Sequence, residues 1–306
     1  MTPLRQRMIE DLRLRNRSGG TIENYVRAVA QFARHFKRSP DQLNREHVRQ
    51  YLLHLIEKKA SWSRCNLVRC ALQFFFKVTL GMEGRFEKLP WARPPMRLPT
   101  VLSRDEVRRL LEVVAHRPRD KALLMTLYGA GLRISEAVAL KGQDIDSAQM
   151  LIHVRQGKGK KDRIVALPDT LLPVLRDAWR ARSKRAARRQ SVQPPPENPA
   201  DKASACWLFT GSRNPQRPMD KKTAYHMVRQ AARRAGIKRP VSPHTLRHTY
   251  ATHQVEAGVH LRKLQLLMGH AHLSTTLLYV HLSQAEIGTA GSPLDRLLPT
   301  TPPTTP

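Results

Sequence analysis

Four short segments in the second half of the chain carry side chains suited to binding and handling a phosphate group. The first, at positions 131–136, has the sequence GLRISE and places Arg133 three residues before Glu136. On a helix this spacing puts both side chains on one face, where the carboxylate can hold the guanidinium in place. A surface ion pair would explain the same hexamer, and the segment alone does not decide between the two interpretations.

The second segment, GKGKK, occupies positions 157–161 and contains Lys158. β-prone residues flank it at 151–154 and 163–167, so we expect a β-hairpin with these lysines in its turn. A lysine at the tip of such a turn can reach a neighbouring phosphodiester. A basic turn that contacts only water would have the same composition.

The third segment, SPHTLRH, begins at Ser242 and has the pattern of a helix start that suits an anion. Ser242 and Pro243 are types favoured at the N-cap and the first helical position. His244 and Arg247 then share one face, close to backbone N–H groups that favour phosphate. His244 and His248 also have the i, i+4 spacing of a metal pair. The glutamate of H-E-x-x-H is missing and no third ligand is evident, so we expect no metal.

The fourth segment, LMGHAHLSTTLLYVHL, contains Tyr279. We expect Gly269 to end one helix, with His270 directly after it. We expect Ser274 to cap the next helix, which would put Tyr279 about one turn into it. Taken alone, Tyr279 has the surroundings of an ordinary half-buried tyrosine.

In this order and spacing, the motifs GLRISE, GKGKKDR, HTLRHTYATH and LMGHAHLSTTLLYVHL resemble those of the tyrosine recombinase (phage integrase) family over residues 100–285. The earlier stretch SGGTIENYVRAVAQF resembles the family's core-binding domain. The resemblance implies an enzyme that cuts and rejoins DNA strands through a covalent 3′-phosphotyrosine intermediate. It also implies that the reaction uses no metal ion, no ATP and no other cofactor.

The resemblance assigns phosphate binding to two arginines. Arg133 and Arg247 would hold the non-bridging oxygens of the scissile phosphate, and Glu136 would support them from behind. Arginine suits this task because it stays charged and its planar fork bonds two oxygens at once. Without a metal ion, such donors must offset the charge that grows on the phosphoryl oxygens.

The resemblance assigns the remaining steps to four other side chains. Tyr279 would attack phosphorus, and His270 would support the phosphate and the nucleophile. Lys158 would protonate the departing 5′ oxygen, while His244 would assist proton transfer. A free tyrosine has a pKa of about 10, so nearby positive groups are needed to favour the phenolate.

The charge balance points to the same class of partner. The 306 residues include 54 Lys and Arg against 24 Asp and Glu, a formal net charge of +30. Such an excess repels itself unless a polyanion compensates it, and nucleic acid is the commonest one. Basic composition also occurs in ordinary proteins of GC-rich genomes. The three cysteines form no C-x-x-C pair, which favours a reducing, cytoplasmic setting.

The elements that would position these residues divide into two expected domains. Residues 1–84 have the apolar spacing of several short helices and would form the core-binding domain. Four prolines between 87 and 100 make 85–100 the expected linker. Residues 101–288 would form the catalytic domain, and 289–306 a flexible tail rich in Pro and Thr. We expect a mainly α protein with one small antiparallel β-sheet, closing on duplex DNA as a C-shaped clamp.

Four questions stay open at this point: the class of enzyme, whether the protein is catalytically active, its biological setting and the role of its tail. A type IB topoisomerase has the same catalytic residue types and acts as a monomer, whereas a recombinase would act as a multimer, a tetramer across two DNA sites. A DNA-binding protein without catalytic activity is the reading from another class. The basic, Pro-rich segment 180–203 favours a mobile-element integrase over a chromosome-dimer resolvase. Leu294, Leu297 and Leu298 would form a tail that docks on a neighbouring subunit.

Overall fold

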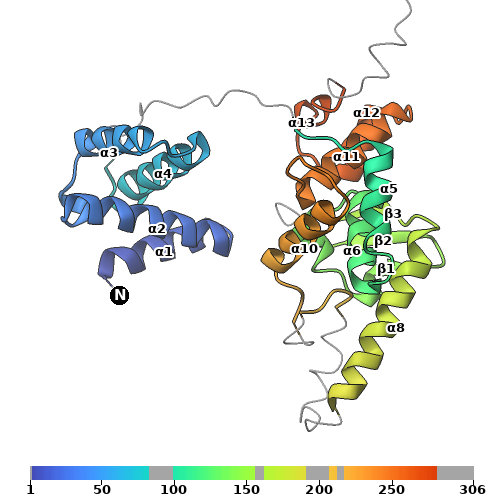
Figure 1. Cartoon of the computed structure of the whole chain (residues 1–306). Helices are drawn as coiled ribbons and strands as arrows, with labels where there is room; N and C mark the ends of the chain where they lie inside the picture. Colours follow the sequence, from blue (N-terminus) through green and yellow to red (C-terminus); the bar gives the residue numbers. More distant parts are fainter. Residues whose placement is uncertain (1, 83–98, 156–161, 191–206, 212–216, 281–306) are drawn as a thin grey trace, which may run out of the picture. The chain divides into compact units, whose positions relative to one another are not determined.

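The chain forms two compact units, residues 1–97 and 98–306, in the computed structural model (Figure 1). The structure describes residues 2–82, 99–155, 162–190, 207–211 and 217–280, and for 184–190 only the backbone. The boundary between the units falls inside the segment expected to be a linker. Most of that segment, the lysine-rich turn at 157–161, the loop at 191–203 and the tail at 289–306 lie outside the described residues.

The first unit is helical throughout its described residues. It consists of α1 (Pro3–Leu14), α2 (Gly19–Phe36), η1 (Pro40–Gln42), α3 (Arg45–Glu57), α4 (Trp62–Phe74) and the π-helix η2 (Phe75–Thr79). The side chains of Ser18, Asn44 and Ser61 accept hydrogen bonds from the first backbone N–H groups of α2, α3 and α4. Phe32 and Phe76 lie fully buried at the centre of its core. The expected bundle of short helices is confirmed.

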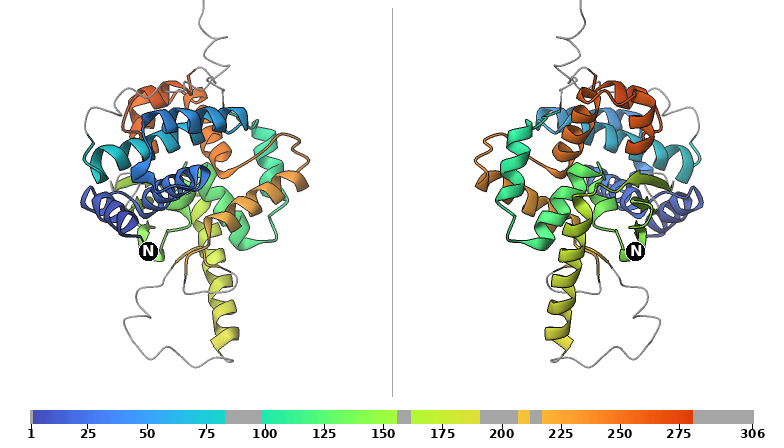
Figure 2. Two further views of the ribbon diagram at one scale, coloured as in Figure 1. Left: turned by 90° about the vertical axis from the view of Figure 1, so that its left-hand side faces the viewer. Right: turned by 90° about the vertical axis from the view of Figure 1, so that its right-hand side faces the viewer.

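The second unit is mainly helical around a small sheet. Its helices are α5 (Arg104–Glu112), α6 (Pro118–Gly129), α7 (Ile134–Ala137), η3 (Gly142–Asp144), α8 (Leu171–Gln190), α10 (Lys221–Arg234), α11 (Pro243–Glu256), α12 (Leu261–Met268) and α13 (Ser274–Leu277). The predicted capping box of α5 is present, since Ser103 and Glu106 each bond the other's backbone N–H. Helix α6 packs against α5, α7, α8 and α11. Helix α8 projects from the body of this unit (Figure 2).

The sheet contains the predicted hairpin and one further short strand. Strands β1 (Ile145–Asp146), β2 (Leu151–Val154) and β3 (Arg163–Ala166) pair antiparallel in the order β1-β2-β3. In the hairpin, Val154 pairs with Arg163 and Leu151 with Ala166. Ile152, Val154 and Val165 are buried in the core of the unit. This register puts Arg163 at the start of β3, where the chain returns from the lysine-rich turn.

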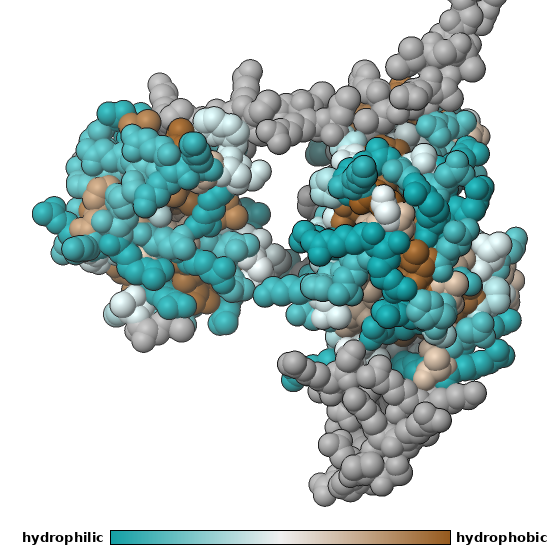
Figure 3. All heavy atoms as spheres, viewed as in Figure 1, coloured by the Kyte–Doolittle hydropathy of each residue, from teal (hydrophilic) through white to brown (hydrophobic). Residues whose placement is uncertain are grey.

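The surface of both units is predominantly hydrophilic on the face seen in Figure 3. No helix among the described residues has both the length and the apolar character needed to cross a membrane. The helices and the three-stranded antiparallel sheet confirm the mainly α fold class with a small antiparallel sheet.

Candidate active site

Helix α11 begins as the sequence indicates and carries three side chains of interest. The Ser242 hydroxyl accepts a hydrogen bond from the Thr245 N–H at 3.2 Å, and Pro243 is the first helical residue. His244 lies in the first turn with an exposed side chain. Arg247, one turn later, is only 4% exposed. The start of α11 therefore directs Arg247 into the interior of the second unit.

Arg247 is held by backbone carbonyls from two other segments. Its Nη1 donates to the carbonyl of Gly131, which precedes α7, and its Nη2 donates to the carbonyl of Met268, at the end of α12. Burial, and then the positive charge of Arg133, lower the pKa of Arg247 to about 10. The guanidinium is still charged at neutral pH and has a fixed orientation.

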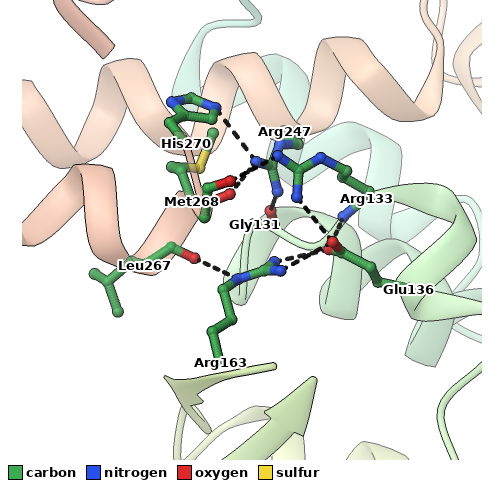
Figure 4. A network of polar contacts seen from close by, with 9 residues as sticks. Gly131, Arg133, Glu136, Arg163, Arg247, Leu267, Met268 and His270 are labelled. Atoms are coloured by element: carbon green, nitrogen blue, oxygen red, sulfur yellow. Dashed lines mark hydrogen bonds and ion pairs between the residues drawn. The ribbon is translucent and has the colours of Figure 1, made fainter. Parts of the chain in front are cut away.

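Three consecutive carbonyls at the end of α12 each accept a hydrogen bond from a different arginine (Figure 4). The pairs are Arg163 with Leu267, Arg247 with Met268 and Arg133 with Gly269. The last carbonyls of a helix have no partner within the helix, and they form the negative end of its dipole. The C-terminus of α12 thus orders three cations that would otherwise repel one another.

Glu136 is the carboxylate that joins two of these arginines. Its Oε1 accepts from Arg133 Nη1 at 2.8 Å and from Arg163 Nη1 at 2.9 Å. Its Oε2 accepts from Arg163 Nη2 at 2.7 Å and from the Arg133 N–H at 2.8 Å. Burial alone would raise the pKa of Glu136, but the hydrogen bonds and charges of Arg163 and Arg133 lower it to about 2.

The surface ion pair considered for Arg133 and Glu136 is wrong, because their side chains are only 17% and 3% exposed. Arg133 is also not inside the helix. It is the N-cap residue of α7, and Glu136 is the third helical residue, whose carboxylate bonds the Arg133 backbone N–H. The two residues therefore meet through a capping arrangement.

Gly269 ends α12 as predicted, in the left-handed conformation with φ +60°. A Cβ at this position would lie 3.0 Å from the Cδ of Arg163. His270 follows directly. Its Nδ1 lies 3.0 Å from the Thr276 hydroxyl, and its Nε2 lies 3.4 Å from Arg247 Nη2. The turn after α12 therefore brings His270 against the buried arginine.

Tyr279 lies next to His270. We expected it about one turn into a helix, but it lies beyond the end of α13. Leu273 already has helical backbone angles, so α13 begins at Ser274 and ends at Leu277, two residues before the tyrosine. Ser274 is the first residue of the helix and not its cap. The Tyr279 ring stacks on the His270 ring, with 6.1 Å between centroids and 17° between planes.

The phenol of Tyr279 is buried and uncharged at neutral pH. Only 2% of the residue is exposed. Burial raises the pKa of Tyr279, while the charges of Arg247 and Arg133 act in the opposite direction. Its hydroxyl lies 3.1 Å from the Nδ1 of His248. Six of the seven residues singled out by the sequence thus gather in the second unit, and the seventh, Lys158, lies outside the described residues.

Two residues of this cluster were missed by the sequence reasoning. Arg163 was taken only as the first residue of a strand, although its place in the hairpin that carries Lys158 was a usable signal. His248 was considered only as half of a metal pair. Its position directly after Arg247 gave no indication that it contacts the tyrosine, because that contact joins residues 31 positions apart.

Comparison with known families fits this arrangement. The model of the phage integrase family matches residues 100–286, and the model of the phage integrase N-terminal SAM-like domain matches residues 4–84. The chain belongs to the phage integrase family. The resemblance inferred from the four motifs is thereby confirmed. Between the two enzyme classes left open, membership favours the site-specific recombinase over the topoisomerase.

Relatives of this integrase extend over nearly its whole length. The protein y4qK of Sinorhizobium fredii, whose name describes an integrase/recombinase, is 42% identical over 100% of this chain and 94% of its own. The tyrosine recombinase XerA of Thermococcus kodakarensis is 34% identical over 87% of this chain and 89% of its own.

Solved structures agree in fold. The XerA recombinase crystal structure is 28% identical with a TM-score of 0.52, covering 94% of this chain and 96% of that one. XerH recombinase bound to its palindromic difH substrate is 21% identical with a TM-score of 0.66, covering 92% and 82%. The Tn1549 transposon integrase bound to transposon right-end DNA is 18% identical with a TM-score of 0.66, covering 95% and 100%. Both Xer and transposon proteins resemble this chain, so the mobile-element assignment stays a prediction.

Proposed function

We propose that this integrase cuts and rejoins duplex DNA with Tyr279 as the nucleophile. The observation that carries this proposal is the position of His270, which contacts the buried guanidinium of Arg247 on one side and the Tyr279 ring on the other. A nucleophile and a fixed cation on either side of one imidazole form a site where a phosphodiester can be both held and attacked.

Phosphate binding is assigned to Arg133 and Arg247. Both are held by backbone carbonyls, and Glu136 additionally holds Arg133. Fixed donors of this kind stabilise charge that develops on the phosphoryl oxygens without having to reorganise during the reaction.

The covalent step is an exchange of one phosphodiester for another. The O–H bond of Tyr279 breaks as its oxygen forms a bond to phosphorus, the bond from phosphorus to the 5′ oxygen breaks, and that oxygen takes a proton from Lys158. A 5′ hydroxyl from another strand then reverses the step. Because the 3′-phosphotyrosine conserves the energy of the original bond, rejoining needs no ATP. His244, exposed at the start of α11, is assigned to assist proton transfer.

The proposed partner is duplex DNA. Exposed basic side chains line a hollow of about 490 Å³ along α10, namely Lys221, Lys222, Arg229 and Arg233. Together with the net charge of +30, they favour a polyanion. The XerH and Tn1549 structures were solved with DNA bound, which supports the same partner for this relative.

We further propose that the active form is a multimer on DNA, a tetramer across two sites. Leu266 on α12, Leu273 just before α13 and Leu277 on α13 are 63%, 40% and 42% exposed, in the segment that leads to Tyr279. Exposed apolar side chains on two helices that contact each other favour a protein contact. The λ integrase of similar fold was solved as a dimer on a core site. The tail with Leu294, Leu297 and Leu298 is expected to dock on a neighbouring subunit. Deleting residues 289–306 should therefore weaken assembly while leaving monomer binding to DNA intact.

Covalent trapping tests the assignment of Tyr279. Random-sequence duplexes with a nick are incubated with the full-length protein, and adducts that survive detergent are isolated and sequenced. We expect the wild type to yield an adduct and Tyr279→Phe to yield none, although it still binds the selected DNA. Tyr128→Phe is the matched control, because this hydroxyl bonds His253 instead. An undiminished adduct in Tyr279→Phe would contradict the assignment, and no adduct with the wild type would favour a DNA-binding protein without activity.

A further inference from the structure

His248 contacts the reactive atom of the proposed nucleophile. Its Nδ1 lies 3.1 Å from the Tyr279 hydroxyl oxygen, and the two rings are tilted by 46° with centroids 5.7 Å apart. His248 is part of α11, which is anchored at its start by Ser242 and is fixed through Arg247. The phenol therefore meets an imidazole whose position the fold determines.

The other two histidines of the site are engaged elsewhere. The two ring nitrogens of His270 face the Thr276 hydroxyl and Arg247 Nη2. The His244 ring is exposed and lies edge-on to Tyr225, with 6.5 Å between centroids. Among the described residues, His248 is thus the histidine that forms a hydrogen bond with the Tyr279 hydroxyl.

We propose that His248 is a further catalytic residue, which accepts the phenolic proton of Tyr279 as the tyrosine attacks phosphorus. The inference rests on the proposed role of Tyr279 as nucleophile. In this step the O–H bond of Tyr279 breaks and an N–H bond forms at His248 Nδ1. The freed electron pair on the phenolic oxygen forms the bond to phosphorus, and the bond to the 5′ oxygen breaks as that oxygen is protonated by Lys158.

The surroundings of His248 keep it in the form that can accept a proton. Burial, and then the charges of His244 and Arg247, lower the pKa of His248 to about 4. The charge of Arg133 also lowers the pKa values of Arg247 and His270, the two groups next to His248. The ring is therefore neutral at pH 7, and with its own proton on Nε2 it offers a lone pair on Nδ1 to the phenol.

The proton of Tyr279 moves to His248 only after a phosphodiester has bound in the site. In the free protein a phenol whose pKa burial has raised faces a weakly basic imidazole, so the proton stays on oxygen. A phosphodiester between the arginines offsets the positive charges that depress the basicity of His248. As the bond to phosphorus forms, the phenolic oxygen becomes far more acidic, and transfer to Nδ1 then becomes favourable.

The same hydrogen bond has another reading, in which His248 only holds Tyr279 in a resting position. The two readings differ in what the imidazole must supply. A proton acceptor cannot be replaced by an amide, because an amide oxygen accepts a hydrogen bond but is not a base. A positioning contact can be replaced by an amide, and a contact that restrains the tyrosine can be removed with a gain in rate.

The experiment measures the rate of single-turnover cleavage with the full-length protein. The substrates are nicked duplexes of the sequence that the wild type selects by covalent capture. The variants are His248→Ala, His248→Gln and the matched control His253→Gln, which alters a second histidine of α11 that bonds a tyrosine, Tyr128, at 2.9 Å. DNA binding by each variant is measured in parallel. If the wild type forms no adduct, the proposed function fails before His248 is tested.

A second substrate separates the two ends of the reaction. It carries sulfur in place of the bridging 5′ oxygen, and a thiolate leaves without needing a proton. We expect His248→Ala and His248→Gln to slow cleavage about 10²- to 10⁴-fold on both substrates, the range for a positioned acid or base. We expect added imidazole to restore part of the rate in His248→Ala but not in His248→Gln, and His253→Gln to cleave within about threefold of the wild type.

Three results would overturn the proposal. Cleavage by His248→Gln at nearly the wild-type rate would mean that the hydrogen bond only positions Tyr279. Faster cleavage by His248→Ala would mean that His248 restrains the nucleophile. Recovery of His248→Ala on the sulfur substrate would assign His248 to the leaving group.

Discussion

Arg163 and Glu136 form a bidentate ion pair, with Nη1 2.9 Å from Oε1 and Nη2 2.7 Å from Oε2. Arg163 begins strand β3, the second strand of the hairpin, whereas Glu136 belongs to α7. Because the same carboxylate holds Arg133, this pair fastens the hairpin to one of the two arginines assigned to the phosphate. Its geometry has consequences for stability that can be measured.

Loss of Arg163 should be costly. Its side chain is 10% exposed and that of Glu136 is 3% exposed, so Arg163→Gln leaves a buried carboxylate with fewer donors. We expect the free energy of unfolding to fall by about 3–5 kcal/mol, as for a buried pair that loses one partner. The measurement is urea unfolding at pH 7.

The matched control is Arg108→Gln, which removes a pair with Asp105 whose side chains are 69% and 78% exposed. That loss should stay below about 1 kcal/mol. Equal losses in the two variants would mean that the buried pair contributes no more than a surface one.

The free energy of unfolding of the second unit should depend on pH through the protonation of Glu136. The pKa of Glu136 is lowered in the folded protein from 4.5 to about 2, so its contribution is complete above the unfolded value. The contribution is lost as pH falls from about 4.5 to about 2, and amounts to roughly 3 kcal/mol at about 1.4 kcal/mol per pH unit.

Urea unfolding of the wild type and Glu136→Gln across this pH range tests the sign. We expect the wild type to be more stable at pH 7 and the difference to shrink as the solution becomes more acidic. A difference that is constant with pH would assign the effect to packing and not to the charge of Glu136.

Alanine substitutions at Gly269 and Gly258 together isolate the contact between position 269 and Arg163. Both have positive φ, +60° and +76°, so an alanine strains the backbone at either position. A Cβ on Gly258 meets nothing within 4 Å, whereas a Cβ on Gly269 would lie 3.0 Å from Arg163 Cδ. We expect Gly258→Ala to lower the free energy of unfolding by about 1 kcal/mol, and Gly269→Ala to cost about 1–3 kcal/mol more.

Thermal unfolding of both variants measures this difference, and cleavage assays extend it. Displacement of Arg163 should also disturb Glu136 and Arg133, so Gly269→Ala should cleave DNA more slowly than Gly258→Ala. Equal unfolding and equal cleavage by the two variants would contradict a role for the Arg163 contact.

DNA binding through α10 predicts a change in salt dependence. Arg229 is exposed in the basic hollow of α10, and each phosphate contact contributes a slope of about −0.9 to the logarithm of affinity against the logarithm of salt. Arg229→Gln should therefore reduce the slope by about one, as measured by anisotropy of labelled duplex DNA. Arg180→Gln, a 72% exposed position on the projecting helix α8, should leave the slope unchanged. Equal slopes for Arg229→Gln and the wild type would argue against α10 as a DNA contact.

Local sequence predicted the features that depend on short-range geometry. Ser103 and Ser242 begin helices as expected, because an N-cap hydroxyl and the backbone it bonds are only three residues apart. The hairpin strands at 151–154 and the residues from 163 onward follow from β-prone residues on both sides of a turn. Gly269 ends α12 because glycine adopts positive φ without strain. The predicted start of α13 was wrong by one residue, since Leu273 already has helical backbone angles and Ser274 is the first helical residue instead of the cap.

The sequence by itself determined the family, through the order of four motifs, and it pointed to Tyr279 as the nucleophile. The tertiary structure decided which side chains support that residue. Arg163 reaches Glu136 across 27 residues, and His248 reaches the Tyr279 hydroxyl across 31. The place of Arg163 in the hairpin indicated that it lies near the site, but neither contact itself can be predicted from local sequence, because each depends on how α7, α11, α12 and the hairpin pack together. Burial in that packing also lowers the pKa of His248 and raises the pKa of Tyr279, which no list of residue types can indicate.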